Sequence, residues 1–263
     1  MDKLMREVAC GINPIREALR AGRRQIERLW VAERKGGGRI GELLALASAR
    51  GVKVETVSDR SLTEAAGTSA HQGIVAFLAA TSILTLEEMV ARIGAQRPVP
   101  PLVILDGIKD PRNCGAIIRS AAGFGIGGIV VPRRRAVGMT ATVAKAAAGG
   151  LEYVMVAEVT NVTQAIQRLK QIGFWIVGAD ERGQARCDTY GFPSPLVLIF
   201  GEEGRGLGPL VKRHCDALVR IPLRGPLHSL NVAVAASILF YEVMRAQGGP
   251  EEAGIDLSPP MSP

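Results

Sequence analysis

Apolar and polar positions alternate along most of this chain in blocks that predict strands and helices in turn. From Leu102 onward, short unbroken apolar runs are separated by segments with the 3.6-residue period of helices. The strands predicted there are Leu102–Leu105, Gly128–Val131, Tyr153–Val156, Trp175–Gly178, Leu196–Phe200 and Ala217–Ile221. The helices predicted there are Gly115–Ala122, Ala141–Ala148, Thr163–Ile172, Leu207–His214 and Leu230–Gln247. Unbroken apolar strands between helices predict an α/β domain with a mostly parallel sheet, covered on both faces.

The first eighty residues predict a separate, small α/β unit. Asn13 as N-cap and Pro14 at the first helical position indicate one helix, and Asp59 or Ser61 is expected to cap another. The other elements expected are strands at Ile26–Ala32, Val52–Val57 and Gly73–Leu78 and a helix over Ile40–Arg50. Residues 1–80 are therefore interpreted as a domain of their own.

The two units are predicted to be joined by a linker over residues 81–101. It holds one amphipathic helix, Leu86–Ile93, followed by a proline cluster that is typical of a semi-rigid connector. The second domain is expected to span 102–247. The tail, 248–263, is rich in Pro, Gly and Ser and is predicted to be disordered.

Composition narrows the functional classes. The chain has 263 residues and a net charge of +7, which favours a polyanionic partner such as nucleic acid, although a basic, solvated surface gives the same charge. Four scattered cysteines and three histidines lack metal-ligand spacing, so no metal site and no disulfide framework are expected. The start lacks an apolar signal region, and the longest apolar run, Val232–Tyr241, is too short to cross a bilayer. That run predicts a helix buried on all sides, and a cytoplasmic protein without membrane contact is expected.

Two loops at predicted strand ends carry candidate chemistry. A glycine-rich loop, Gly201–Gly208, follows the strand that ends at Phe200, and a second loop opens at Pro222 and brings Ser229 and Asn231 to the start of the last helix. Loops at strand ends are where α/β proteins place ligands, and glycine lets the backbone approach a ligand closely. Ordinary tight connections are the alternative interpretation.

A third candidate stretch follows the strand that ends at Leu105. A polar turn with Arg112 and Asn113 precedes the helix predicted from Gly115, and Arg119 lies early in that helix. An anion at this helix start would meet free backbone N–H groups and cations. The alternative is that Arg119 pairs with a sheet carboxylate such as Asp106.

Other patterns have weaker functional interpretations. The glycines of Gly123–Gly128 resemble a dinucleotide fingerprint, but they close a helix and precede a strand, so they are interpreted as a helix end. Arg133, Arg134 and Arg135 follow a strand and are either a solvated face or a phosphate-binding group. The remaining candidates, His71, Phe174 and Trp175, are expected to have packing roles.

Three motifs taken together carry a family resemblance. They are D106-G-I-K-D-P-R-N113-C-G115-x3-R119, F-G201-E-E203-G-R-G206-L and I221-P-L-x5-S229-L-N231-V-A. Their order and spacing resemble the SpoU/TrmH family of RNA ribose 2′-O-methyltransferases, within the SPOUT superfamily. The segments G11-I-N-P-I-R-E-A-L-R and H71-Q-G-I look like that family's substrate-binding domain, so the resemblance covers roughly residues 8–246.

The resemblance implies a fold, a cofactor and an assembly. The implied fold is a knotted (trefoil) methyltransferase domain preceded by the small RNA-binding domain. The implied cofactor is S-adenosylmethionine, and the implied assembly is a homodimer with active sites at the subunit interface. The cofactor contacts would fall at Gly201, Ile221, Leu230, Ala179 and Pro222.

The resemblance also assigns roles to single residues. Arg119 would act at the reacting ribose, and because a guanidinium stays protonated, clamping the adjacent phosphate suits it better than accepting a proton. Asn113 and Glu203 would hold Arg119 or the nucleotide, and Ser229 and Asn231 would position substrate. Exposed cations expected to contact RNA are Arg112, Arg133, Arg134 and Arg135.

The chain departs from the family's pattern at one place, and the sequence leaves several substrates and functions open. Family members often have S-A-G-A where this chain has Ala147–Gly150, so any contact of that hydroxyl is in doubt. The expected substrate is a guanosine of 23S ribosomal RNA. Transfer RNA, a resistance-type ribosomal methylation and a non-catalytic RNA-binding assembly factor are the alternatives. A nicotinamide-dependent oxidoreductase is disfavoured by the placement of the glycines.

Overall fold

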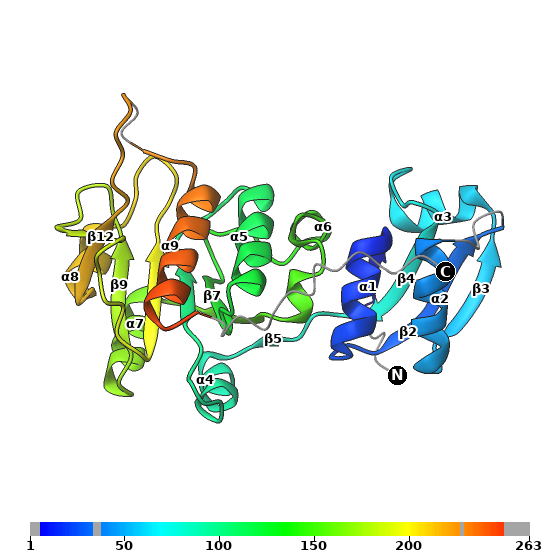
Figure 1. Cartoon of the computed structure of the whole chain (residues 1–263), viewed down its shortest axis with the longest axis horizontal. Helices are drawn as coiled ribbons and strands as arrows, with labels where there is room; N and C mark the ends of the chain where they lie inside the picture. Colours follow the sequence, from blue (N-terminus) through cyan, green and yellow to red (C-terminus); the bar gives the residue numbers. More distant parts are fainter. Residues whose placement is uncertain (1–5, 34–37, 227–228, 250–263) are drawn as a thin grey trace, which may run out of the picture.

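The protein consists of two α/β units that lie side by side (Figure 1). The computed structural model describes residues 6–33, 38–226 and 229–249. The smaller unit is N-terminal, and the larger one follows it along the chain. Of the tail predicted to be disordered, only Gly248 and Gly249 lie within the described residues.

The small unit is a four-stranded sheet in the order β1-β4-β2-β3. Its strands are β1 (Arg6–Cys10), β2 (Ile26–Ala32), β3 (Lys53–Val57) and β4 (Ile74–Ala79). Its helices are α1 (Ile12–Ala21), α2 (Arg39–Ala49) and α3 (Asp59–Ala66). Apolar side chains of α1 and α2 pack on one face of the sheet, and those of α3 pack on the other. Strand β1, which the sequence pattern did not indicate, pairs antiparallel with β4.

Two helix starts in this unit differ from the prediction. The N-cap of α1 is Gly11 rather than Asn13, and the first free N–H, that of Ile12, donates to the side-chain oxygen of Gln72 at 2.8 Å. The N-cap of α3 is Ser58, whose hydroxyl accepts from the N–H of Ser61 at 3.2 Å. In α1 the cap comes from a residue distant in sequence, which local pattern cannot reveal.

The large unit has eight strands in the order β10-β12-β9-β11-β6-β7-β8-β5, and every pair is parallel. The strands are β5 (Ile83–Leu84), β6 (Leu102–Leu105), β7 (Gly128–Pro132), β8 (Met155–Val159), β9 (Trp175–Ala179), β10 (Ala185–Arg186), β11 (Leu196–Phe200) and β12 (Ala217–Arg220). The helices are α4 (Leu86–Gly94), α5 (Pro111–Gly123), α6 (Ala141–Ala147), α7 (Val162–Gln171), α8 (Pro209–His214) and α9 (Val232–Ala246), with a 3₁₀ turn η1 (Gly150–Glu152). Helices α5, α6 and α9 cover one face, and α4, α7 and α8 cover the other. The predicted α/β class with a parallel sheet is confirmed.

The segment interpreted as a linker is packed into this larger unit. Strand β5 extends the sheet by pairing with β8, and Met89 and Ile93 of α4 are fully buried in the core. Residues 81–101 therefore contribute a strand and a covering helix as well as the connection between the units.

Three further local expectations are corrected. Helix α5 begins at Pro111, with Asp110 as its N-cap, so Asn113 lies in the first helical turn and not in a loop. Helix α9 is not buried on all sides, because Val234 and Tyr241 are 48% and 47% exposed. Trp175 is 41% exposed rather than part of the core.

The two units are held together by a buried ionic contact. Arg24 donates from Nε to Glu152 of η1 at 2.9 Å, and Glu152 is only 2% exposed. Arg24 also donates to Glu7 of β1 at 2.5 Å. Nearby, the hydroxyl of Tyr153 donates to Glu17 of α1 at 2.6 Å. This contact fixes α1 of the small unit against η1 of the large unit.

The order of the strands in the large sheet predicts a crevice at the edge that their carboxyl ends form. Strands β6, β7 and β8 succeed one another in space, whereas β11 is inserted between β6 and β9. Such a switch leaves a crevice at the carboxyl ends of the strands, where open α/β sheets bind ligands. The trefoil knot implied by the resemblance stays a prediction. Within the described residues, no helix is both long and apolar enough to cross a membrane.

Candidate active site

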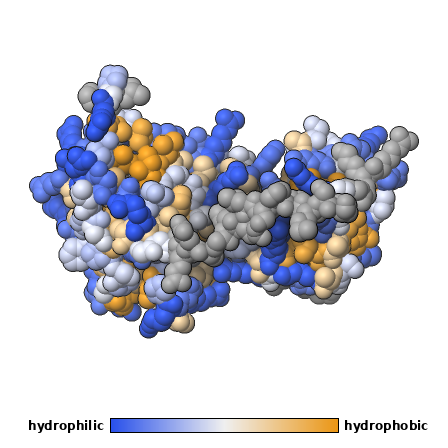
Figure 2. All heavy atoms as spheres, viewed as in Figure 1, coloured by the Kyte–Doolittle hydropathy of each residue, from blue (hydrophilic) through white to orange (hydrophobic). Residues whose placement is uncertain are grey.

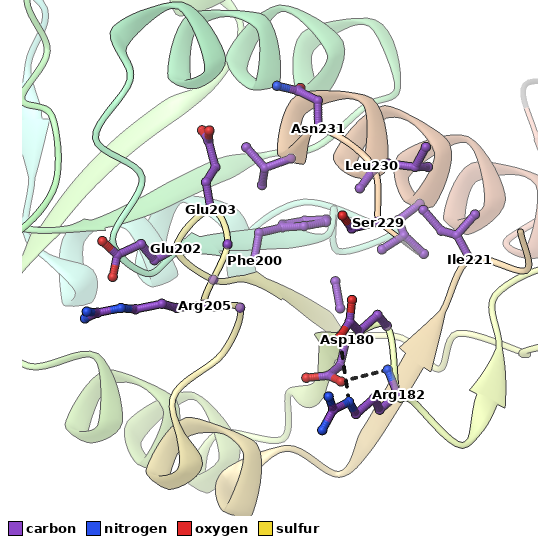
Figure 3. Close-up of a pocket in the computed structure, with 18 of the residues that line it drawn as sticks. Asp180, Arg182, Phe200, Glu202, Glu203, Arg205, Ile221, Ser229, Leu230 and Asn231 are labelled. Atoms are coloured by element: carbon purple, nitrogen blue, oxygen red, sulfur yellow. Dashed lines mark hydrogen bonds and ion pairs between the residues drawn. The ribbon is translucent and has the colours of Figure 1, made fainter. Parts of the chain in front are cut away.

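A cavity of about 650 Å³ lies at the carboxyl ends of β9, β11 and β12, beside the N-terminus of α9. In Figure 3, Glu202, Glu203 and Arg205 lie on one side of it, and Ile221, Ser229 and Leu230 on the other. Apolar side chains such as Ile221, Leu230 and Leu239 line part of the wall. Its size and mixed lining are typical of a small-molecule site.

The glycine-rich loop folds back on itself at this cavity. A Cβ added at Gly201 would lie 2.2 Å from the carbonyl carbon and oxygen of Gly206, which is far inside van der Waals contact. Gly206 itself has φ 65°, and its N–H donates to the carbonyl of Glu202 at 2.7 Å. Gly201 must be a glycine because a side chain there would clash with the backbone of Gly206. Gly206 favours glycine because its φ is positive.

Three side chains from three distant segments form an oriented hydrogen-bond chain. The side-chain oxygen of Asn231, the N-cap of α9, accepts the N–H groups of Ala233 at 2.9 Å and Val234 at 3.3 Å. With its oxygen so engaged, the Asn231 amide nitrogen donates to the Asn113 side-chain oxygen at 3.0 Å. The Asn113 nitrogen in turn donates to a carboxylate oxygen of Glu203. The start of α9 thus fixes the orientation of both amides and directs a donor at Glu203.

Several other charged groups around the cavity are paired. The Lys109 ammonium contacts Glu202, and this hydrogen bond is the main cause that lowers the pKa of the Glu202 carboxyl. Asp180, almost fully buried, pairs with Lys212 at 2.5 Å. Burial first, and then the charge of Glu202, raise the pKa of the half-buried Asp106 carboxyl.

Most residues expected at the site are brought together. The cavity is lined by Ala179, Gly201, Glu203, Ile221, Ser229, Leu230 and Asn231. Asn113 adjoins the cavity through its hydrogen bonds to two of these residues. Pro222 follows a lining residue without lining the cavity itself.

Arg119 is not among these residues. It lies six positions after Asn113 on α5, which corresponds to about 9 Å along the axis and about 240° around it. It is exposed and forms no hydrogen bond or ion pair with any residue that the structure describes. The alternative partner, Asp106, is influenced instead by Glu202 and Arg135.

The arginines expected to contact RNA also lie outside the cavity lining. Arg112, Arg134 and Arg135 are exposed, and Arg133 is 3.6 Å from Glu158. They stay candidate phosphate-binding groups.

Several charged residues of the cavity wall were not predicted from the sequence. They are Asp180, Glu181, Arg182, Glu202, Arg205 and Lys212. Asp180 directly follows strand β9, and a polar residue at a strand end is the signal that could have identified it. Among the described residues, no group of three or more His, Cys, Asp or Glu side chains is arranged to hold a metal ion.

Two family models match the chain, one for each unit. The description "SpoU rRNA Methylase family" matches residues 100–241, and "RNA 2'-O ribose methyltransferase substrate binding" matches residues 8–83. The chain belongs to the SpoU rRNA methylase family. The boundary between the two matches falls within residues 81–101.

Similar proteins span both units of this methylase. A putative TrmH family tRNA/rRNA methyltransferase, YacO of Bacillus subtilis, is 39% identical over 89% of this chain and 94% of its own length. The 23S rRNA (guanosine-2'-O-)-methyltransferase RlmB of Shewanella oneidensis is 38% identical over 91% of this chain and 97% of its own. The crystal structure of an AdoMet-bound rRNA methyltransferase from Sinorhizobium meliloti has a TM-score of 0.73 and 26% identity, covering 91% of this chain and 87% of that one. The resemblance that the three motifs carried is thereby confirmed.

Proposed function

We propose that this SpoU-family RNA 2′-O-methyltransferase acts on a guanosine ribose of 23S ribosomal RNA. The observation that carries the chemistry is the Asn231–Asn113–Glu203 hydrogen-bond chain at the edge of a cofactor-sized cavity. The choice of 23S ribosomal RNA rests on the similarity to RlmB proteins, which extends over both units.

S-adenosylmethionine is the cofactor, and when bound it supplies an electrophilic methyl group on a sulfonium. The cavity fits such a molecule in two respects. Ile221, Leu230 and Leu239 offer apolar surface to a planar base, and the bare backbone of the Gly201 loop leaves room for close approach. Glu203, which is bonded by the neutral Asn113 amide, adds negative charge near a cationic ligand, whereas the charges of Asp180 and Glu202 are balanced by Lys212 and Lys109.

Glu203 is assigned as the acceptor of the ribose hydroxyl proton. Transfer forms a bond between the 2′-oxygen and the methyl carbon, breaks the sulfur–methyl bond and releases the hydroxyl proton. The Glu203 carboxylate is exposed at the cavity and is oriented by the Asn113 amide, so it can accept a hydrogen bond from the 2′-hydroxyl and then its proton. Ser229, on the opposite wall, is positioned to bind the nucleotide.

Arg119 is assigned to the site of a second copy in a homodimer. Three features of the α5–α9 face support this arrangement. Arg119 is exposed without a partner among the described residues, Val234 and Tyr241 are about half exposed on α9, and Phe124 packs edge-to-face on Tyr241 at 6.2 Å. Figure 2 shows apolar side chains gathered on the face of the large unit where α9 lies in Figure 1. Across such an interface, Arg119 would clamp the phosphate beside the reacting ribose.

Methyl transfer by the purified protein is the direct test of this function. With S-adenosylmethionine and ribosomal RNA from a strain that lacks the corresponding gene, we expect one new 2′-O-methylated guanosine in 23S RNA. Transfer RNA from the same strain is the control substrate. Methylation of transfer RNA alone would refute the 23S assignment, and binding of RNA without any methyl transfer would favour an assembly factor.

Loss of Arg119 should abolish transfer while cofactor binding persists. Arg119→Ala and Glu203→Ala are each expected to reduce methyl transfer at least 100-fold, and exposed Arg168→Ala of α7, the control, should not. If Arg119 acts in the partner's site, co-expressing the two inactive variants restores about a quarter of the wild-type activity, because one site in each mixed dimer is complete. No restoration, or a monomer in sedimentation, would overturn the shared site.

A transfer RNA substrate is the second candidate. The name of the Bacillus subtilis relative leaves both RNA classes open. A cytoplasmic location is part of the proposal for either RNA.

A further inference from the structure

One face of the small sheet carries an aromatic and cationic surface that the proposed reaction does not use. Val8, Phe77, Arg28 and Lys53 are directly opposite one another across β1, β4, β2 and β3, so their side chains share a face. In the next row, Trp30 lies opposite Glu55. Helix α3 packs at one end of this face, through Leu62 and its neighbours, but Val8 at the other end is 38% exposed.

Two aromatic rings and one guanidinium are packed together at the centre of this face. The rings of Trp30 and Phe77 meet edge to face with centroids 4.8 Å apart. The guanidinium carbon of Arg28 lies 4.6 Å from the Phe77 centroid and 5.2 Å from the Trp30 centroid. The two rings lie edge to face and the guanidinium lies over both, so the three groups together form a partly exposed aromatic and cationic platform.

Arg28 has hydrogen-bonding capacity that the described residues do not use. Its Nε is buried and has no hydrogen-bond partner, and Arg28 forms no ion pair within hydrogen-bonding distance among the residues that the structure describes. Glu55, whose charge interacts with that of Arg28, accepts from Trp30 Nε1 at 2.7 Å and pairs with Lys53 at 2.6 Å. These two hydrogen bonds, Lys53 first, are the main causes that lower the pKa of the Glu55 carboxyl.

Lys53 adds an exposed charge at the edge of this surface. Its side chain is 73% exposed at the end of the Val8–Phe77–Arg28–Lys53 row. A platform that offers π-faces, a stacked guanidinium and a lysine fits a polyanion with planar bases, because bases stack on aromatic rings and guanidinium planes while cations bind the phosphates. A peptide or a membrane would not use the planar groups in this way.

We propose that this sheet face of the small unit is a binding site for single-stranded RNA, in which one or two unpaired bases stack on the Arg28–Phe77–Trp30 platform. Lys53 and the free N–H groups of Arg28 bind the adjoining phosphates. The site lies within residues 8–83, which match the substrate-binding family model, and the proposal rests on the proposed function for its choice of RNA over DNA. Through this site the small unit contacts RNA at a surface that is separate from the methyl-transfer cavity.

Tryptophan fluorescence of the full chain tests this site. The chain has two tryptophans, so Trp175→Phe leaves Trp30 as the only reporter. Titration with a short unstructured oligoribonucleotide is expected to quench Trp30 emission by stacking, whereas heparin, a polyanion without bases, should not. Arg28→Gln and Phe77→Leu should each weaken oligoribonucleotide binding about tenfold, and the control Arg168→Gln should leave it unchanged.

The outcomes separate this site from the proposed function. Equal quenching by heparin, or unchanged RNA affinity in a folded Arg28→Gln variant, would overturn the stacking site, even if the wild-type protein methylates RNA. Loss of methyl transfer to long RNA together with unchanged S-adenosylmethionine affinity in Arg28→Gln is the result that the proposal requires. If Phe77→Leu does not fold, Arg28→Gln and Lys53→Gln decide the question, since both positions are on the partly exposed side of the face. Absence of any methyl transfer by the wild-type protein would instead reject the proposed function.

Discussion

Asn231 uses both ends of its side-chain amide, and this gives one residue two separable effects. Its oxygen caps α9, and its nitrogen orients Asn113 toward Glu203. An N-cap contributes about 1 kcal/mol to stability. The orientation of Asn113 contributes to chemistry and not to the fold.

Asn231→Asp should separate these effects. The aspartate keeps the cap and suits the helix N-terminus, so the melting temperature should stay near the wild-type value. It cannot donate to Asn113, whose amide would turn its nitrogen toward the new carboxylate and its oxygen toward Glu203, and methyl transfer should fall at least tenfold. Asn231→Ala should lose both activity and about 1 kcal/mol of stability. An Asn231→Asp enzyme with normal turnover would show that the hydrogen-bond chain is not used.

At the scale of elements, the site is built where loops and helix starts meet at the carboxyl ends of strands. The Gly201 loop leaves β11, the segment from Ile221 leaves β12, and α5 and α9 present their first turns. These loops and first helical turns have little stability of their own, so their positions are fixed by the sheet beneath them.

Gly201→Ala tests how tightly the loop is built. The added methyl would lie 2.2 Å from the backbone of Gly206, so the loop must move and the cavity must change shape. We expect at least a tenfold loss of S-adenosylmethionine affinity by calorimetry. Gly138→Ala, where the added methyl meets nothing within 4 Å and the backbone conformation is ordinary, is the matched control. Equal affinity in both variants would contradict a cofactor site at this loop.

At the scale of the whole molecule, the Arg24–Glu152 contact holds the small unit in position against the large unit. Glu152 is buried, so its carboxylate depends on Arg24 for charge compensation. Removing one member of a buried pair costs about 3–5 kcal/mol, whereas removing both charges costs much less.

A double-mutant cycle tests this contact. Arg24→Met should lower the stability of the protein by about 3 kcal/mol or more in urea unfolding, and Arg24→Met with Glu152→Gln should recover most of the loss. Small-angle scattering of Arg24→Met should report a larger radius of gyration, since the units are no longer held together. Exposed Arg60→Met of α3, which removes a surface pair with the helical neighbour Glu64, is the control. Additive effects of the two changes would argue against a coupled pair.

The sequence by itself determined the order and type of most elements. The strands Ile26–Ala32, Leu102–Leu105 and Leu196–Phe200 were predicted to the residue, because an unbroken or alternating apolar run reports directly on burial in a sheet. It also identified the glycine loop and the three polar motifs, since these residue types are confined to turns, caps and ligand-binding loops. The buried His71 and the glycines that end α5 were predicted for the same local reasons.

Only the tertiary structure decided which of these residues meet. It placed Asn113, Glu203 and Asn231 in one hydrogen-bond chain, turned Arg119 away from them, and left Val234 and Tyr241 exposed on a helix whose sequence is largely apolar. Periodicity reflects interactions between near neighbours along the chain, whereas these contacts depend on the path by which β11 and α9 return to strands formed earlier in the sequence. That path is set by packing of the whole sheet, and no local pattern records it.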